Sequence, residues 1–313
     1  MLRFLARRVA SGLAMLVAIS TVAYLLIYLA GTDIARNLLG QNASEEAVAA
    51  RAAELGLDRP LLERFIDWVS GAVRGDLGTS WFSGAPVTDL VTSRLGVTLS
   101  LVVLSTLLVA VIATVVGVLA AVRRGWVDRV LQVVSLVGAA IPNYLVALLL
   151  VTILAIQLQW FEPTGYVRPE VSLSGWAMSI TLPVVALIIS AIAAVAQQVR
   201  GSMIDGLRQD YVRTLRSRGL PEWRVIYLHV LRNAAGPALS VLALLFVGLL
   251  GGAVVIEQVF AIPGLGSLSV STTTQGDVPV IMGVVVVVAI IVLIVNLAID
   301  LLQGWLNPKA RLS

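Results

Sequence analysis

Cysteine is absent from this chain of 313 residues, and histidine occurs once, as His229. The first absence excludes disulfides, thiolate nucleophiles and Cys-ligated zinc or iron–sulfur sites, and a single histidine cannot build a His-based metal cluster. Charge is scarce as well: 13% of the residues are charged and 58% are hydrophobic, whereas soluble domains have about 25% charged and about 45–50% apolar residues. A chain with so few polar residues cannot cover the surface of a water-soluble globule. A soluble enzyme is therefore excluded, and a polytopic membrane protein is predicted.

Six stretches of the chain carry no charged residue, and each is 22 to 32 residues long. They are Val9–Ala30, Leu95–Val122, Val130–Phe161, Val171–Val199, Asn233–Ile256 and Val278–Ile299. A helix of about 20 apolar residues crosses a hydrocarbon core about 30 Å thick, and it satisfies its own backbone hydrogen bonds, which lipid cannot do. Six membrane-spanning helices are therefore predicted, the third with a break or kink at Pro142.

The first stretch follows Arg3, Arg7 and Arg8, as the apolar part of a signal peptide would. Its 22 residues exceed the 7–15 of a secretory h-region, and no small-x-small cleavage site clearly follows it. We interpret it as an uncleaved first span.

The placement of basic residues, of which 21 of 22 are arginine, predicts the orientation. With the N-terminus in the cytoplasm, the segments on that side hold 15 basic and four acidic residues, and those on the other side hold seven basic and 12 acidic residues. Cytoplasmic segments carry the excess of basic residues, so both termini are predicted to be cytoplasmic. The predicted segments are the N-terminus with the first span (1–30), an external helical segment (31–94), the second to fourth spans (95–199), a cytoplasmic loop (200–236), and the last two spans with the tail (237–313).

The external segment is predicted to hold two helices. Ser44–Leu55 has Glu45 and Glu46 in its first turn, where the helix dipole favours acids, and Gly56 can end it. A second helix opens at Asp58-Arg59-Pro60 and carries one apolar face, formed by Leu62, Phe65, Ile66, Val69 and Val73. That face is expected to pack on the chain's own membrane domain, with another protein as the alternative. A tight turn is predicted at Gly75–Ser80, where two glycines flank Asp76.

The cytoplasmic loop is predicted to form two helices at an angle. An apolar stripe recurs every four residues along the first, at Met203, Leu207, Tyr211 and Leu215. Gly219 can end this helix and Pro221 can open the next. The second helix carries Trp223, Ile226, Tyr227, Val230 and Leu231.

Two interpretations of this loop remain open. A basic amphipathic helix can lie on anionic lipid headgroups. The acidic residues among the arginines, Asp205, Asp210 and Glu222, and the two-helix shape favour a surface on which another protein docks.

Four motifs in order along the chain resemble the permeases of ABC importers, specifically the B-type subunit of the dipeptide/oligopeptide branch. They are Gly56–Pro60 with Gly75–Ser80, Asp210–Leu220 with His229–Asn233 and Pro237, Glu257–Gly266, and Asn296–Leu302 with Asn307-Pro308. The second resembles the coupling loop that binds the ATPase. Arg213-Thr214-Leu215 stand where the general permease motif has Glu-Ala-Ala, and Leu215 replaces the alanine usual in this branch.

The resemblance implies an all-α type I importer permease with six transmembrane helices and an added external helical segment, located as a multi-pass protein in a bacterial plasma membrane. It implies a second homologous permease, two P-loop ATPases and an external substrate-binding protein as partners, with the lipid bilayer around them and no nucleic acid. ATP and magnesium are expected on the ATPases, because this chain has no Gly-x-x-x-x-Gly-Lys-Ser/Thr motif. The chain itself is therefore expected to have no catalytic, cofactor or metal site. Short peptides are the expected cargo, with nickel complexes or glutathione as alternatives.

Three groups of candidate residues follow from the resemblance. The ATPase-docking candidates are Met203, Leu207, Asp210, Tyr211, Arg213, Thr214, Leu215, Arg218 and Gly219. The candidates for gating or structure are Glu257, Pro263, Gly264 and Asp300, and those for contact with the external binding protein are Asp76, Leu77 and Gly78. Internal packing is the alternative role for the docking group.

A transporter that acts alone, driven by an ion gradient, is the competing class. Ion coupling usually needs charged or polar groups at mid-membrane, and the middle portions of these spans have no charged residue. The two halves of the chain also do not repeat each other. A membrane enzyme is disfavoured too, since the sequence has no paired carboxylates, nucleophile motif or metal-binding set.

Overall fold

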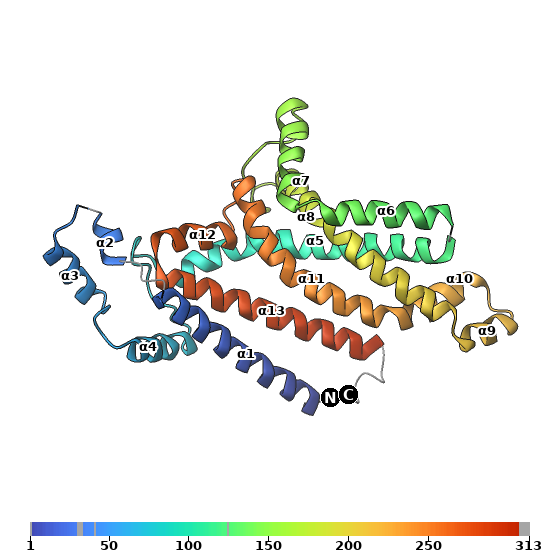
Figure 1. The fold of residues 1–313 in the computed structure, drawn as a ribbon, viewed down its shortest axis with the longest axis horizontal. Helices are drawn as coiled ribbons and strands as arrows, with labels where there is room; N and C mark the ends of the chain where they lie inside the picture. Colours follow the sequence, from blue (N-terminus) through green and yellow to red (C-terminus); the bar gives the residue numbers. More distant parts are fainter. Residues whose placement is uncertain (1, 30–33, 41, 124, 307–313) are drawn as a thin grey trace. The chain divides into compact units, whose positions relative to one another are not determined.

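The computed structural model describes residues 2–29, 34–40, 42–123 and 125–306. Over these ranges the chain is helical, and its extended backbone pairs only at one isolated bridge, between Thr79 and Pro86. The elements, drawn in Figure 1, are α1 (Leu2–Leu29), α2 (Ile34–Leu39), α3 (Glu45–Glu54), α4 (Leu61–Val73), α5 (Val87–Arg123), α6 (Trp126–Ala140), α7 (Asn143–Leu150), the π-helical η1 (Val151–Gln157), α8 (Leu173–Leu207), α9 (Asp210–Ser217), α10 (Glu222–Arg224), the π-helical η2 (Val225–Val230), α11 (Leu231–Val259), α12 (Leu265–Gln275) and α13 (Val278–Leu306). Asn307 and Pro308 of the fourth motif lie outside the described residues.

Long apolar helices account for the six predicted spans. Five helical stretches within the described residues are long and apolar enough to cross a membrane on their own, and α6 with α7 and η1 forms a sixth if the bent pair counts as one span. The bend between its two arms is 91°. It falls at Pro142, as predicted, and Figure 1 shows α7 turning away from α6. Several helices are longer than the charge-free runs, and α5 begins eight residues before Leu95.

The chain forms two compact units. The first comprises Met1–Phe4, Thr98–Ile262 and Ile294–Ser313, and the second comprises Leu5–Val97 and Pro263–Leu293. The long helices α5 and α13 contribute to both units.

The first unit is built around α8, which packs against α6, α7 and α11. Small and branched apolar residues line its buried faces, and Pro183 is among them without interrupting the helix. α5 approaches α8 so closely at Gly117 that an added Cβ would lie 2.7 Å from the Ala196 carbonyl oxygen and 2.7 Å from Val199. Only glycine fits at that crossing.

The second unit has a core that joins α1 to the helices after it. Tyr24, Ile34, Val278 and Met282 are its buried members. The ring of Phe65 on α4 lies 5.1 Å from that of Tyr24 and 6.2 Å from that of Trp68, centre to centre.

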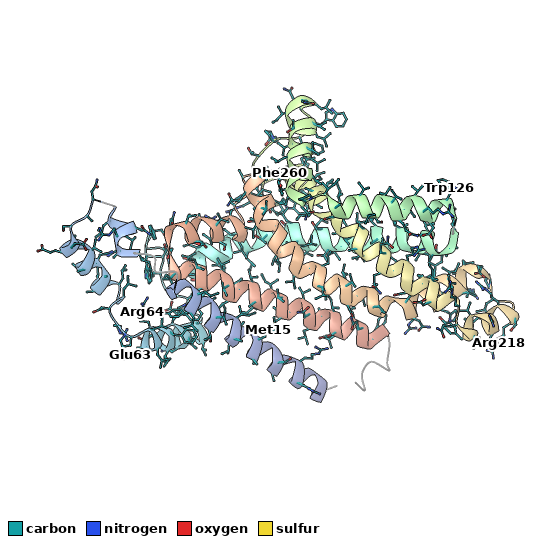
Figure 2. The ribbon with its side chains drawn as sticks, in the orientation of Figure 1. Met15, Glu63, Arg64, Trp126, Arg218 and Phe260 are labelled. Atoms are coloured by element: carbon teal, nitrogen blue, oxygen red, sulfur yellow. The ribbon has the colours of Figure 1, made fainter. Side chains whose placement is uncertain are left out.

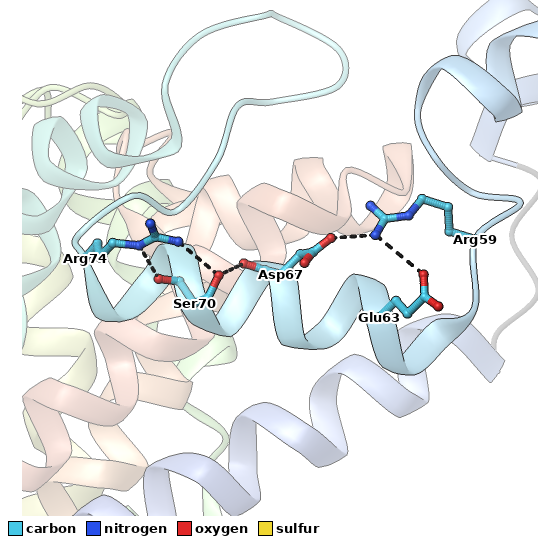
Figure 3. Close-up of polar contacts among 5 residues, drawn as sticks. All are labelled: Arg59, Glu63, Asp67, Ser70 and Arg74. Atoms are coloured by element: carbon cyan, nitrogen blue, oxygen red, sulfur yellow. Dashed lines mark hydrogen bonds and ion pairs between the residues drawn. The ribbon is translucent and has the colours of Figure 1, made fainter.

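The predicted helices of the 31–94 segment are present. Ser44 caps α3 by accepting from the Ala47 N–H, and Gly56 follows the helix with φ of 66°. On the polar side of α4, Arg59 pairs with Asp67 at 2.7 Å and with Glu63 at 3.6 Å (Figure 3). The bond to Asp67 raises the pKa of Arg59. The predicted apolar face of α4 packs only in part, since Leu62 and Val73 remain 67% and 83% exposed.

Candidate functional site

The region predicted to dock an ATPase folds as two short helices beyond the end of α8 (Figure 1). The predicted single helix through Met203 and Leu215 is wrong: α8 ends at Leu207, and α9 begins afresh at Asp210. Gln209 takes an extended conformation at the junction, with φ of −69° and ψ of 148°. The four-residue stripe is therefore divided between two helices. We call residues 208–230 the hairpin.

The turn of the hairpin forms where the sequence predicts it. Gly219 has φ of 77°, a left-handed conformation that glycine adopts without the strain of a side chain. Pro221 then precedes α10, which continues through η2 into α11 as one helical stretch from Glu222 to Val259. Figure 2 shows Arg218 at the tip of this turn.

The buried side of the hairpin differs from the predicted stripe. Met203 is fully buried, so its side chain packs inside the chain and is not presented to a partner. Val212, which the stripe leaves out, is fully buried too, together with Val225 and Val230 of η2. A Cβ on Gly206 would lie 2.9 Å from Val230, which shows how tightly α8 meets η2. The restart of the helix at Asp210 explains the shift of the buried face from Tyr211 to Val212.

The other docking candidates lie on the accessible side of the hairpin or at its edge. Leu207, Tyr211 and Leu215 are half-buried, and the Tyr211 hydroxyl accepts a hydrogen bond of 3.3 Å from the Asn233 side chain. The exposed candidates are Asp210, Arg213, Thr214, Arg218 and Gly219. An apolar edge at Leu215 bordered by charged side chains is thus available on this surface.

Two ion pairs hold the ends of this region. Arg216 of α9 donates two hydrogen bonds to Glu222 of α10, which raises the pKa of Arg216. Both side chains are about half exposed. Arg200 of α8 donates two to Asp128 of α6, at 2.5 and 2.7 Å, and this pair is more enclosed.

Glu257 is the most deeply buried acid among the gating candidates, with no exposed surface. It lies near the end of α11, and Thr98 of α5 donates to its Oε1 at 2.6 Å. Ala261 follows with φ of 50°, a conformation that is rare for a residue other than glycine. Pro263 is exposed, Gly264 is buried at the start of α12, and Asp300 is half-buried on α13. The bond to Thr98 joins Glu257 to a second helix, α5.

The 75–86 loop holds the third group of candidates. Asp76 is exposed, and its Oδ1 accepts from the Gly78 N–H at 2.8 Å, which closes the predicted turn. Leu77 and Gly78 are half-buried against α13, where Leu77 lies 3.6 Å from the position of a Cβ on Gly283. Asp76 is therefore the most accessible of the three.

A residue that the sequence did not single out anchors this loop. Asp277 is 1% exposed and accepts from Ser80 Oγ at 2.5 Å and from the Trp81 N–H at 3.2 Å. Ser80 Oγ in turn accepts from the N–H groups of Phe82 and Ser83. The only signal in the sequence was an acid directly before a long apolar run.

Comparison with known proteins identifies the family. The profile described as "Binding-protein-dependent transport system inner membrane component" matches residues 113–312, and the N-terminal profile of such membrane components matches residues 1–102. The chain belongs to this family. Its relatives include a probable peptide ABC transporter permease of Sinorhizobium fredii, 36% identical over 98% of this chain and 99% of the relative. A putative peptide transport system permease of Brucella abortus is 34% identical over 97% and 98%, and a glutathione transport system permease of Escherichia coli is 33% identical over 99% of each chain.

Family membership makes the chain a permease component of an ABC importer, a multi-pass membrane protein that works with ATPase subunits and a binding protein. The two profile matches include the hairpin, the 75–86 loop and the Glu257 segment.

Proposed function

We propose that this chain is one of two permease subunits of an ATP-driven importer that carries short peptides into a bacterial cell. The observation that carries this proposal is the end-to-end similarity to permeases named for peptide transport. The all-helical fold, with five or six candidate spans among the described residues, and the hairpin that joins α8 to α11 support it.

ATP hydrolysis is assigned to separate subunits, which bind ATP and magnesium. This chain has no Walker A motif to hold the phosphates. We propose a complex with a second homologous permease and two ATPases, fed by an external binding protein. The arginine distribution supports an orientation with both termini and the hairpin in the cytoplasm, in the plasma membrane.

The hairpin is proposed to dock on an ATPase through its exposed edge, centred on Leu215, Thr214 and Arg218. α9 follows α8 after a junction of two residues, packs on η2, and is tied to α11 by the hydrogen bond from Asn233 to Tyr211. A displacement of α9 by the ATPase would therefore move α8 and α11 with it. This coupling would switch the path between inward-facing and outward-facing states.

Glu257 is proposed to take part in that switch, since its bond to Thr98 joins α11 to α5. Glu257→Gln keeps an acceptor for Thr98, whereas Glu257→Leu removes it. We expect the leucine variant to hydrolyse more ATP for each peptide carried and the glutamine variant to stay close to wild type. Equal coupling in the wild type and the leucine variant would contradict a gating role.

Peptides are the first choice of cargo. Glutathione is the second, because the chain is 33% identical to a permease named for glutathione transport.

The test is to tag the C-terminus, extract the native membrane gently and identify the copurifying proteins by mass spectrometry. We expect a second permease and P-loop ATPases. The complex is then reconstituted with its binding protein, and uptake of radiolabelled peptides and of glutathione is compared with and without ATP. Transport by this chain alone, without ATP, would contradict the proposal.

A further inference from the structure

A break in the third span interrupts the helical backbone at membrane depth. α6 ends at Ala140, and Pro142 has no N–H to give to the Gly138 carbonyl. We take Asp128, which lies beside the start of the charge-free run, as the edge of the hydrocarbon core. Gly138 lies ten residues beyond it, which at about 1.5 Å per residue is about 15 Å, half of a core about 30 Å thick. Non-helical backbone at this depth is tolerated where protein buries it or where it lines a water-filled cavity.

The break opens on a surface of its unit and not into the core. Ile141 and Tyr144, on either side of Pro142, are 36% and 46% exposed. α7 nevertheless packs against both α8 and α11, which fixes its first residue, Asn143.

The amide of Asn143 is held at one end and open at the other. Ser190 of α8 donates from Oγ to Asn143 Oδ1 at 2.5 Å. Among the described residues, no group accepts from Asn143 Nδ2, and the side chain is half-buried. Nδ2 is not among the described side-chain atoms that are enclosed without a partner, so it keeps an accessible surface and its N–H groups are available to a ligand.

Gly252 of α11 leaves the donor uncovered. A Cβ on Gly252 would lie 3.6 Å from Asn143 Nδ2 and 3.6 Å from Leu187 Cδ2. These are ordinary contact distances, so a methyl group would fit there and would cover one side of the amide.

We propose that Asn143, oriented by Ser190, binds the backbone of the transported peptide. The inference rests on the proposed function, since it takes a peptide as cargo. Each peptide unit offers a carbonyl acceptor, and Asn Nδ2 carries two N–H donors. A contact with the backbone does not depend on the cargo's side chains, so one site serves peptides of different sequence.

The first test measures uptake of radiolabelled trialanine by the reconstituted complex. Asn143→Leu removes the donor and Gly252→Ala covers it, and each is expected to lower uptake roughly three- to tenfold, the effect of one lost hydrogen bond. Thr152→Val is the matched control, because the Thr152 hydroxyl in η1 bonds to the Leu148 carbonyl of its own helical segment. Its uptake should match the wild type, and all three variants should copurify with the partner subunits.

The absence of cysteine allows a second test. Tyr144→Cys is expected to react with a membrane-impermeant thiol reagent and to be protected by trialanine. Leu136→Cys is the control: Leu136 is 74% exposed and lies on α6, seven residues before Asn143, so trialanine should not change its labelling. Loss of the partner subunits from Asn143→Leu would overturn the inference, since the break would then be a subunit contact.

The outcomes separate the inference from the function on which it rests. Wild-type uptake of trialanine, with unchanged uptake by Asn143→Leu and Gly252→Ala or no labelling of Tyr144→Cys, would overturn the inference alone. A wild-type complex that uses ATP but carries no peptide would refute the proposed peptide cargo, and the inference with it.

Discussion

The 75–86 loop and the hairpin are both polar connections between apolar helices, yet they are held in different ways. The loop is anchored by one fully enclosed acid, Asp277, that accepts from Ser80 and Trp81. The hairpin is held by apolar side chains beneath it and by an exposed ion pair, Arg216–Glu222, across its turn. Buried hydrogen bonds to a charge are costly to lose, whereas exposed pairs contribute little. The loop is therefore held rigidly by buried hydrogen bonds, whereas the hairpin has a packed inner side and an accessible outer edge.

The largest effect is expected from a charge on that accessible edge. Leu215→Glu should leave the folded permease intact, because Leu215 is only half-buried, but it would place an unpaired charge in the proposed ATPase contact. Such a charge costs about 2–5 kcal/mol at an interface, or about 30-fold or more in affinity. Copurification of the ATPase and peptide uptake measure the loss. Ser217→Glu puts the same charge on an exposed part of α9 and is expected to be nearly neutral; equal losses in both variants would remove the case for Leu215.

Removing the anchor of the loop should give the next largest effect. Asp277→Ala leaves Ser80 Oγ and the Trp81 N–H without their acceptor. The Trp81 contact is only partly buried, so the cost comes mainly from Ser80 and is about 1–3 kcal/mol. We expect a lower unfolding temperature of the purified complex and faster proteolysis within residues 75–86. Asp277→Asn retains an acceptor, so its unfolding temperature should lie between those of the wild type and Asp277→Ala. Asp76→Ala, at an exposed turn of the same loop, is the control. If it lowered the unfolding temperature as much as Asp277→Ala, the loop would not be anchored mainly by Asp277.

The turn of the hairpin should show a smaller, purely conformational effect. Gly219 has φ of 77°, and no atom lies within 4 Å of an added Cβ. Gly219→Ala should therefore cost about 1–2 kcal/mol through the backbone alone. Gly219→Asn should recover part of it, because asparagine tolerates this conformation better. Thermal unfolding and ATPase copurification of the two variants test this, and alanine equal to wild type would show that the turn has other conformations.

The smallest effect is expected at the exposed ion pair. Arg216→Ala and Glu222→Ala should each cost less than about 1 kcal/mol, since both side chains are about half exposed. A double-mutant cycle on unfolding, repeated at high salt, isolates the pair, whose coupling should shrink as salt screens it. A coupling as large as the cost of Asp277→Ala would erase the difference between the two regions.

Local signals in the sequence predict much of the fold. Ser44 and Gly56 mark the ends of α3, the charge-free runs mark the spans, and Pro142 marks the bend of the third. Each signal acts on its near neighbours through backbone geometry or hydropathy. Such signals can therefore be recognised without knowing which distant residues they contact.

Other features depend on residues far apart in the chain and could not be predicted. The stripe from Met203 to Leu215 keeps its period across the junction at Gln209, so the break in the helix is invisible to a periodicity argument. Asp277 becomes an anchor only because Ser80, 197 residues away, lies beside it. The sequence placed only some of the docking candidates correctly on the surface. Asp210, Arg213, Thr214, Arg218 and Gly219 are exposed, whereas Met203 is in the core.

The six-residue π-helical turn η2 gives the hairpin a dependence on chain length. A π-helical turn is an α-helix with an extra residue accommodated in its circumference. Deleting one residue there would restore the α-helical winding. It would rotate the part of the hairpin that precedes η2 by about 100° about the axis of α11. Amino-acid composition and hydropathy would hardly change, but the face that the hairpin offers to a partner would. Within a lineage of such chains, a one-residue insertion or deletion at this point would thus alter subunit compatibility more than many substitutions elsewhere.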